Sequence, residues 1–220
     1  MKTKLVIFDL DGTLVNSLYD LADAVNYALA KNGLPTHERE KYRFMVGNGR
    51  SVLADRAMMI PEGSDSELKR AVLADYDHYY GGHYKDNTRP YEGTAELLKA
   101  LDERGVGYCV LSNKPDFFTK AIISELFPGS DFAYVMGKRD EFPTKPDPAS
   151  VNAVMRELSV TAEECLYIGD SNVDMKTAAN AGIESVGVSW GFRSVEELEA
   201  AGASHIADVP GDILKYLKEQ

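Results

Sequence analysis

Apolar residues follow two rhythms along the chain, one typical of buried strands and one typical of amphipathic helices. Short apolar runs rich in β-branched and aromatic residues, each ended by polar residues or glycine, predict strands buried on both faces. Five such runs occur, at residues 3–9, 106–113, 132–137, 165–171 and 184–191. Stretches with helical spacing surround the last four, at residues 94–105, after Pro115, and at residues 147–160, 172–182 and 195–202. The chain therefore alternates helix and strand from residue 94 onward.

The segment between the first two predicted strands has a helical pattern throughout. From Asn16, apolar residues recur on one helical face, and Gly33 marks the end of that helix. Further helical stretches follow Thr36 and cover residues 65–80. Residues 81–93 are dense in Gly, Pro, Asn and Asp, which indicates a linker back to the strands. The pattern predicts a helical insertion after the first strand.

Strands that alternate with helices predict an α/β fold, with a parallel, Rossmann-like sheet covered by helices on both faces. The helical insertion predicts a second, smaller domain beside that sheet. We expect residues 1–15 and 88–220 to form the α/β core and residues 16–87 to form a helical cap domain. With 220 residues, the chain is long enough to bury a core without disulfides or metals.

Small and charged residues gather where the predicted strands end. They are Asp9 and Asp11 after the first strand, Ser112 and Asn113 after the second, Asp170 and Asp174 after the fourth, and Lys145 in the turn before residues 147–160. The carboxyl ends of parallel strands meet at one edge of a sheet, where such sheets bind ligands. Because buried carboxylates are costly unless they are paired or bound to a cation, this set predicts a functional site.

The sequence D-x-D-G at residues 9–12 could also begin a calcium-binding loop. Such a loop needs Gly at position six and Glu at position twelve, and these positions hold Leu14 and Asp20. The calcium alternative therefore fails on spacing. A turn and a helix cap would account for one aspartate, but two at strand spacing share one face, and a second acidic pair ends another strand.

The net charge of −11 narrows the range of partners. A nucleic acid or an anionic membrane favours a basic face, so neither is expected, whereas a small anionic substrate fits if a metal or local cations offset the field. Cys109 and Cys165 lie in apolar runs, which favours buried thiols in a reducing cytoplasm, although a disulfide stays open. The apolar run near residue 5 is too short for a signal peptide or a membrane span. We expect a soluble, cytoplasmic monomer or homodimer.

Four segments in chain order resemble the motifs of the haloacid dehalogenase-like hydrolases. They are FDLDGTL at residues 8–14, LSN at 111–113, KPDP at 145–148 and GDSNVD at 169–174. The interval between the first two matches the helical cap of that family, so the resemblance covers most of the chain. Within the family, the chain is most similar to the phosphoglycolate phosphatase-like branch.

The resemblance implies phosphoryl transfer through an aspartyl-phosphate. Asp9 would be the nucleophile, and Asp11 would be the general acid toward the leaving group and then the general base for water. Ser112 and Asn113 would donate hydrogen bonds to the phosphoryl oxygens. Lys145 would offset negative charge on both the phosphate and Asp9.

The resemblance also implies a Mg²⁺ cofactor. Asp9, the main-chain carbonyl of Asp11, and Asp170 would be its ligands, and Asp174 would be either a ligand or a support behind them. The metal would allow an anionic phosphate to approach an anionic nucleophile in a protein of net charge −11.

The family implies a phosphatase for a small phosphate monoester, with 2-phosphoglycolate as the first candidate. A sugar phosphomutase similar to β-phosphoglucomutase, a pyrophosphate or nucleotide phosphatase, and a phosphate-binding regulator without turnover are the alternatives. In the insertion, VGNGR at residues 46–50 resembles the specificity segment of this branch. Arg50 could bind a substrate carboxylate in a bidentate manner, and a solvated arginine on a glycine-rich turn is an equal alternative.

Two segments next to the motifs carry weaker signals. Lys114 follows Asn113 and could reach a phosphate, but the sequence favours a surface lysine. SWGFR at residues 189–193 follows a strand end and could line the entrance to the site. Trp190 and Phe192 within it are more often packing residues than ligand platforms.

Overall fold

The computed structural model describes residues 2–218, and the chain divides into two compact units. One unit comprises Met1–Val15 and Pro90–Gln220, and the other comprises Asn16–Arg89. The helical segment is therefore inserted between the first strand of the first unit and the rest of that unit. None of the helices in the described part of the chain has both the length and the apolar character that a membrane span requires.

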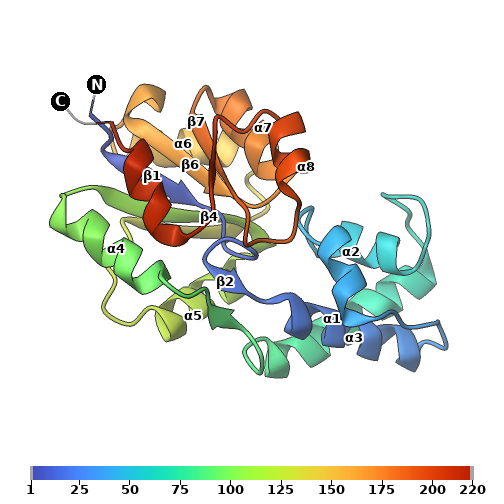
Figure 1. Ribbon diagram of the computed structural model, residues 1–220. Coiled ribbons are helices and arrows are strands. Elements are labelled where there is room, and N and C mark those ends of the chain that lie inside the picture. The colour runs from blue at the N-terminus through green and yellow to red at the C-terminus, as the bar shows by residue number, and fades with distance from the viewer. Residues whose placement is uncertain (1, 219–220) are drawn as a thin grey trace. The chain divides into compact units, whose positions relative to one another are not determined.

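A six-stranded sheet forms the centre of the first unit (Figure 1). Its strands, in spatial order, are β5 (Tyr134–Lys138), β4 (Gly107–Pro115), β1 (Leu5–Phe8), β6 (Cys165–Gly169), β7 (Glu184–Val188) and β8 (His205–Ala207). Neighbouring strands pair in parallel throughout the sheet. This confirms the α/β, Rossmann-like fold class. The edge strand β8 was not predicted, because three residues do not form an apolar run that can be distinguished from a turn.

Strand β1 lies at the centre of this order, between β4 and β6. Ile7 is opposite Cys109 on β4 and opposite Tyr167 on β6. The chain continues from β1 toward β4 on one side, and it returns to β6 on the other side. In parallel sheets, ligands bind outside the carboxyl ends of the strands at such a reversal, which here is the position directly after Phe8.

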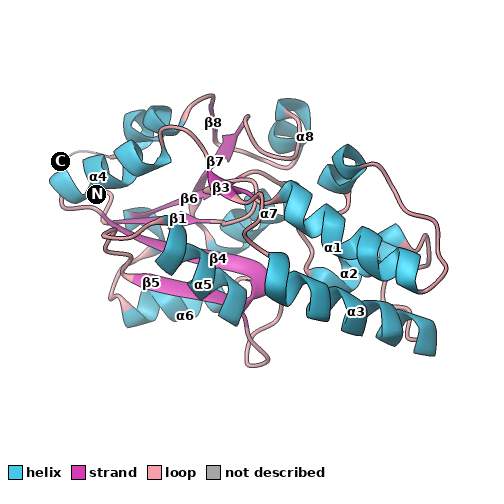
Figure 2. Cartoon of the chain, turned by 90° about the horizontal axis from the view of Figure 1, so that it is seen from below, coloured by secondary structure: helices cyan, strands magenta, loops and turns pink. Residues whose placement is uncertain are grey.

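Helices cover both faces of the sheet (Figures 1 and 2). They are α4 (Thr94–Glu103), α5 (Asp116–Leu126), α6 (Ala149–Glu157), α7 (Asn172–Ala181) and α8 (Val195–Ala200), with the short 3₁₀ segments η2 (Ala162–Glu164) and η3 (Pro210–Tyr216). Figure 1 shows α4 and α5 on one side and α6 and α7 on the other, as right-handed crossovers require. Helix α4 begins at Thr94, directly after Gly93, which has φ 86°.

The core on the α6 and α7 side follows the alternation of the strands. Leu5 and Ile7 of β1 point to this face, and both are at most 2% exposed. Cys109 and Cys165, on the strands that flank β1, lie in the same apolar cluster as free, buried thiols. Because β1 is apolar on both faces and buried along its length, it provides a rigid base for the residues that follow it.

The second unit is helical, with a few short irregular elements. Its elements are α1 (Leu18–Lys31), the 3₁₀ segment η1 (Arg39–Phe44), α2 (Arg50–Ala57) and α3 (Glu67–His83). Helix α3 continues through Gly81 and Gly82, so the prediction of a linker from residue 81 was wrong at its start. Stacked rings support this last turn, since Tyr79 and His83 have ring centroids 4.2 Å apart. Aromatic packing thus offsets the low helix propensity of the two glycines.

The two segments that link the units pair with each other. They are β2 (Val15–Asn16) and β3 (Arg89–Pro90), which form a two-stranded sheet. The buried carboxylate of Asp20 fixes the residues before β3, because it accepts hydrogen bonds from the main-chain N–H groups of Asn87 and Thr88 and from the Thr88 hydroxyl at 2.6 Å.

Candidate active site

Asp9 directly follows β1, at the point where the chain leaves the sheet. Its main-chain N–H still donates to Ile168 O at 2.9 Å, so its position is fixed by the sheet itself. The chain then turns tightly, with Gly12 at φ 86°. A Cβ atom on Gly12 would lie 2.2 Å from an Asp170 carboxylate oxygen. Glycine at this position therefore allows both the left-handed turn and the close approach of the two acidic loops.

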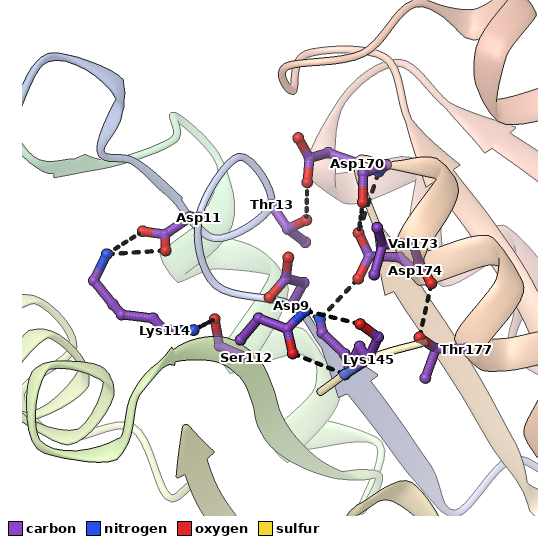
Figure 3. A network of polar contacts seen from close by, with 12 residues as sticks. Asp9, Asp11, Thr13, Ser112, Lys114, Lys145, Asp170, Val173, Asp174 and Thr177 are labelled. Atoms are coloured by element: carbon purple, nitrogen blue, oxygen red, sulfur yellow. Dashed lines mark hydrogen bonds and ion pairs between the residues drawn. The ribbon is translucent and has the colours of Figure 1, made fainter. Parts of the chain in front are cut away.

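Lys145 is a cation in direct contact with Asp9. Its Nζ lies 3.0 Å from Asp9 Oδ1 and 2.8 Å from Asp174 Oδ1, and its side chain is 3% exposed (Figure 3). Burial alone would lower the pKa of Lys145, but the charges of Asp174 and Asp9 outweigh burial and raise it. Lys145 therefore stays protonated and places a full positive charge between two carboxylates.

Asn113 holds the Lys145 loop in place. Its Nδ2 donates to Lys145 O at 3.1 Å, and its Oδ1 accepts from Lys145 N at 2.8 Å. The Asn113 amide thus acts as a strand partner for a loop 32 residues away. Ser112, which precedes it on β4, belongs to the same polar network and accepts from Lys114 N at 3.2 Å.

Three buried carboxylates meet at this edge of the sheet. Asp9, Asp170 and Asp174 each offer an oxygen within 4.8 Å of the others. Burial raises the pKa of Asp9 to about 7, with Lys145 opposing and Asp174 adding to the shift. Burial, followed by the charges of Asp174 and Asp9, also raises the pKa of Asp170 well above its usual value. The cluster has an excess of negative charge that a cation would relieve.

The two carboxylates on the β6 side are held differently. Asp174 Oδ2 accepts from Ser171 N at 3.2 Å and from Ser171 Oγ at 2.6 Å, while its Oδ1 accepts from Lys145. Asp174 therefore caps α7 and binds Lys145 with the same carboxylate. Asp170 accepts from Phe192 N at 2.8 Å, and its contact with Thr13 Oγ1 is long, at 3.5 Å.

This donor set fits a magnesium ion. Mg²⁺ prefers hard oxygen ligands and is usually bound by one or two carboxylates, with water completing its shell. Asp9 Oδ1 is buried and has no hydrogen-bond partner among the described residues, although it faces Lys145. The absence of a Cβ on Gly12 brings Asp170 close to the turn after Asp9. Carboxylate oxygens with unused lone pairs thus converge at one point.

Asp11 lies on the same turn but contacts a different cation. Lys114 Nζ donates to both of its oxygens, at 2.8 and 2.9 Å, and only 6% of Lys114 is exposed (Figure 3). The prediction of a surface lysine at this position was wrong. The reason is that Lys114 continues strand β4 after Asn113, and from this strand its side chain reaches Asp11.

Arg50 belongs to the second unit. It is the first residue of α2, after Gly49 at φ 83°, and its Nη1 lies 2.8 Å from Asp77 Oδ2. Both side chains are about two-fifths exposed, at 40% and 44%. Arg56 fixes the glycine-rich loop before Arg50, because its guanidinium donates to Met45 O at 2.9 Å and to Asn48 Oδ1 at 3.0 Å.

Comparisons with known proteins place the chain in a family. The model of the haloacid dehalogenase-like hydrolases matches residues 6–188. A phosphoglycolate phosphatase of Pseudomonas savastanoi pv. phaseolicola is 38% identical over 192 residues, which is 86% of this chain and 70% of that protein. A phosphoglycolate phosphatase of Colwellia psychrerythraea is 33% identical over 98% of this chain and 97% of its own length. The crystal structure of a protein from Lactobacillus delbrueckii subsp. bulgaricus is similar to this structure, with a TM-score of 0.93, 33% sequence identity and complete coverage of both chains.

The chain therefore belongs to the haloacid dehalogenase-like hydrolases, and the resemblance inferred from the four motifs is confirmed. Within that family it is a phosphoric monoester hydrolase, as its similarity to phosphoglycolate phosphatases over 70% and 97% of their lengths shows.

Proposed function

We propose that this phosphatase hydrolyses 2-phosphoglycolate through a phosphoenzyme formed on Asp9. The observation that carries the proposal is the environment of Asp9: it is buried at the end of the central strand, 3.0 Å from Lys145 and within a cluster of carboxylates. Such a carboxylate is positioned to attack an electrophile, and the adjacent cation offsets charge as the bond forms. The substrate itself is taken from the relatives, which are phosphoglycolate phosphatases.

In the first step, a carboxylate oxygen of Asp9 attacks the phosphorus atom. The bond between phosphorus and the ester oxygen breaks, and the leaving alkoxide takes a proton from Asp11, which yields glycolate and an aspartyl-phosphate. In this scheme, the hydroxyl of Ser112 donates a hydrogen bond to a phosphoryl oxygen. Lys145 balances the charge that Asp9 and the phosphoryl group carry together.

In the second step, water attacks the phosphorus atom of the aspartyl-phosphate. Asp11, now a carboxylate, takes the proton from that water, and the bond between phosphorus and Asp9 breaks. Inorganic phosphate leaves, and both aspartates return to their starting forms. Phosphoryl transfer needs little covalent help beyond this, so positioning and charge provide most of the catalysis.

Phosphatases of this family generally depend on Mg²⁺, and the buried acidic cluster suits that cofactor. Asp9, Asp170 and the main-chain carbonyl of Asp11 would hold the ion, with Asp174 as a further ligand or as their support. When bound, the ion neutralises the cluster and so reduces the repulsion between the phosphate and Asp9.

We further propose that the helical unit is a cap that selects the substrate. Its glycine-rich loop carries Arg50 at the start of a helix, and that loop is fixed by Arg56. The guanidinium of Arg50 suits the carboxylate that 2-phosphoglycolate carries in addition to its phosphate. When substrate binds, Arg50 would release Asp77 and pair with the substrate carboxylate instead.

The test is phosphate release from 2-phosphoglycolate with Mg²⁺, compared with sugar phosphates, pyrophosphate and nucleotides, with Asp9→Asn as the blank. The proposal predicts kcat/KM of at least about 10⁴ M⁻¹s⁻¹ on 2-phosphoglycolate and much lower values on the others. Weak and even turnover across the set would overturn the substrate. An isomerised sugar phosphate in place of free phosphate would identify a mutase, and turnover by Asp9→Asn would overturn the nucleophile.

A further inference from the structure

The segment Trp190–Phe192 follows β7, and the mechanism above assigns it no role. The sequence suggests that it could line the entrance to the site. In the structure, Gly191 and Phe192 are buried and Trp190 is half-buried. Its residues lie against two acidic loops, which are the turn after β1 and the residue that follows β6. These contacts give the segment a more specific task than packing.

Phe192 and Gly191 hold Asp170. Phe192 N–H donates to Asp170 Oδ2 at 2.8 Å. A Cβ on Gly191 would lie 2.2 Å from Asp170 Cβ and 2.7 Å from Gly12 O, so Gly191 fits between the two acidic loops. Its φ lies outside the left-handed region, so space and not backbone conformation requires glycine here.

Trp190 holds the turn that follows β1. Its indole Nε1–H donates to Thr13 O at 3.1 Å, which fixes the turn that carries Asp9 and Asp11. The Thr13 side chain is buried and points toward Asp170 (Figure 3). The segment therefore contacts the acidic loop after β1 through Trp190 and the acidic residue after β6 through Phe192, with Gly191 between them.

Repulsion makes such a support necessary. Asp9, Asp170 and Asp174 are all buried, and like charges at this distance favour rotation of the carboxylates away from one another. Asp174 is held by Ser171 and Lys145, whereas Asp170 receives a short hydrogen bond from Phe192 N. By comparison, the contact of Asp170 with Thr13 Oγ1 is long, at 3.5 Å, so Phe192 N is its closer support.

We propose that Trp190, Gly191 and Phe192 are positioning residues that hold Asp170 and the Asp9 turn at the spacing a divalent cation requires. The inference rests on the Mg²⁺ site of the proposed function but not on the identity of the substrate. Groups that orient metal ligands typically contribute about 10- to 100-fold to metal affinity. The segment therefore determines how tightly the cation binds.

The test is calorimetric titration of Mg²⁺ into the metal-free protein. Gly191→Ala is expected to weaken Mg²⁺ binding at least about tenfold, since its Cβ displaces Asp170. The matched control is Gly211→Ala, because Gly211 also lies outside the left-handed region and its Cβ would meet no described atom within 4 Å. That control should bind Mg²⁺ like the unaltered protein.

A second variant covers the case in which Gly191→Ala does not fold. Trp190→Phe keeps an aromatic ring but removes the Nε1–H donor, and it should also weaken Mg²⁺ binding while thermal unfolding confirms the fold. Because Trp190 is the only tryptophan, its fluorescence in the unaltered protein should change during the Mg²⁺ titration. Folded variants whose Kd stays within about threefold of the original would overturn the inference, since the expected effect is larger.

The two proposals fail in different ways. A protein that binds Mg²⁺ in the expected order of variants but does not hydrolyse 2-phosphoglycolate would support the positioning role and overturn the substrate. A protein that hydrolyses 2-phosphoglycolate with unchanged Mg²⁺ affinity in both variants would support the function and overturn the positioning role. Absence of Mg²⁺ binding by the unaltered protein would overturn both.

Discussion

Lys114 Nζ lies 2.8 and 2.9 Å from the two carboxylate oxygens of Asp11. The lysine side chain is 3% exposed and the aspartate side chain 15%, so water screens this pair only weakly. Lys114 therefore fixes the direction of the carboxylate to which we assign both proton transfers. Its own strand, β4, also carries Ser112, so the support of Asp11 and the residue that we propose to bind phosphate belong to one element.

Replacement of Lys114 by Met should mainly affect the chemical step. General acid and base catalysis contributes about 10²- to 10⁴-fold, and a misdirected Asp11 would lose part of it, so kcat should fall by about 10- to 100-fold. KM for the substrate should change little. Lys114→Arg, which keeps a cation, should recover part of kcat. The measurement is steady-state kinetics with Mg²⁺ in excess.

Lys120→Met is the matched control, since Lys120 is half-exposed and pairs with Asp116 on the surface. It should leave kcat unchanged. If Lys114→Met also kept the original kcat, Asp11 would not need this partner, and the assignment of Lys114 as a support for Asp11 would be wrong.

Lys145 should contribute strongly to stability, because it neutralises two buried carboxylates. Lys145→Met leaves Asp9 and Asp174 without their cation, and loss of one partner of a buried ion pair costs about 3–5 kcal/mol. Adding Asp174→Asn should recover part of this free energy of unfolding, since it removes one of the stranded charges. Urea unfolding without metal, in a double-mutant cycle, measures both effects. Additive losses would contradict a direct coupling of Lys145 and Asp174.

The sequence predicted which residues gather at one edge of the sheet wherever a residue follows the end of a strand. Asp9 and Asp170 follow adjacent parallel strands, and strand order alone brings their positions together. Prediction from the sequence failed for Lys114, whose partner Asp11 lies 103 residues away. No local pattern distinguishes a buried lysine with a distant carboxylate from a lysine on the surface. Only the register of β4 against β1 decides between them.

The role of Gly191 shows the same limit in another form. A glycine at the end of a strand indicates a close approach of some other group, but the sequence does not say which. The structure identifies that group as Asp170, with the main-chain oxygen of Gly12 also close. Likewise, Asn113 was predicted to donate a hydrogen bond to a phosphoryl oxygen, but nothing in the sequence predicted that its side-chain amide engages the main chain of Lys145. Partners between loops depend on the assembled sheet.

The stability of the metal-free protein should fall as pH rises through neutrality. The folded state raises the pKa of Asp9 to about 7 and that of Asp170 well above its usual value, mainly by burial. Both groups titrate near pH 4 in an unfolded chain, so the stability they contribute is complete below about pH 4 and is lost as pH rises through the folded values. Carboxylates with a lowered pKa act in the opposite sense, but in the acid range.

Thermal unfolding in a chelator, between about pH 6 and about pH 8, measures this loss. The midpoint should decrease with pH, Asp170→Asn should flatten the decrease, and excess Mg²⁺ should raise the midpoint most at the alkaline end. A midpoint that increases with pH over this range would show that the cluster does not hold protons in the folded state.

Arg50 should affect which substrate is bound rather than how fast the phosphoryl group moves. Hydrogen bonds to charged groups contribute about 1.5–3 kcal/mol, so Arg50→Ala should raise KM for 2-phosphoglycolate at least about tenfold. KM for p-nitrophenyl phosphate, which has no carboxylate, should stay unchanged, and so should kcat for both.

Arg70→Ala is the matched control, since Arg70 is an exposed arginine of the same unit paired with Asp65. Because the Arg50–Asp77 pair is well exposed, its loss should hardly change stability. An equal rise in KM for both substrates would mean that Arg50 binds no substrate carboxylate.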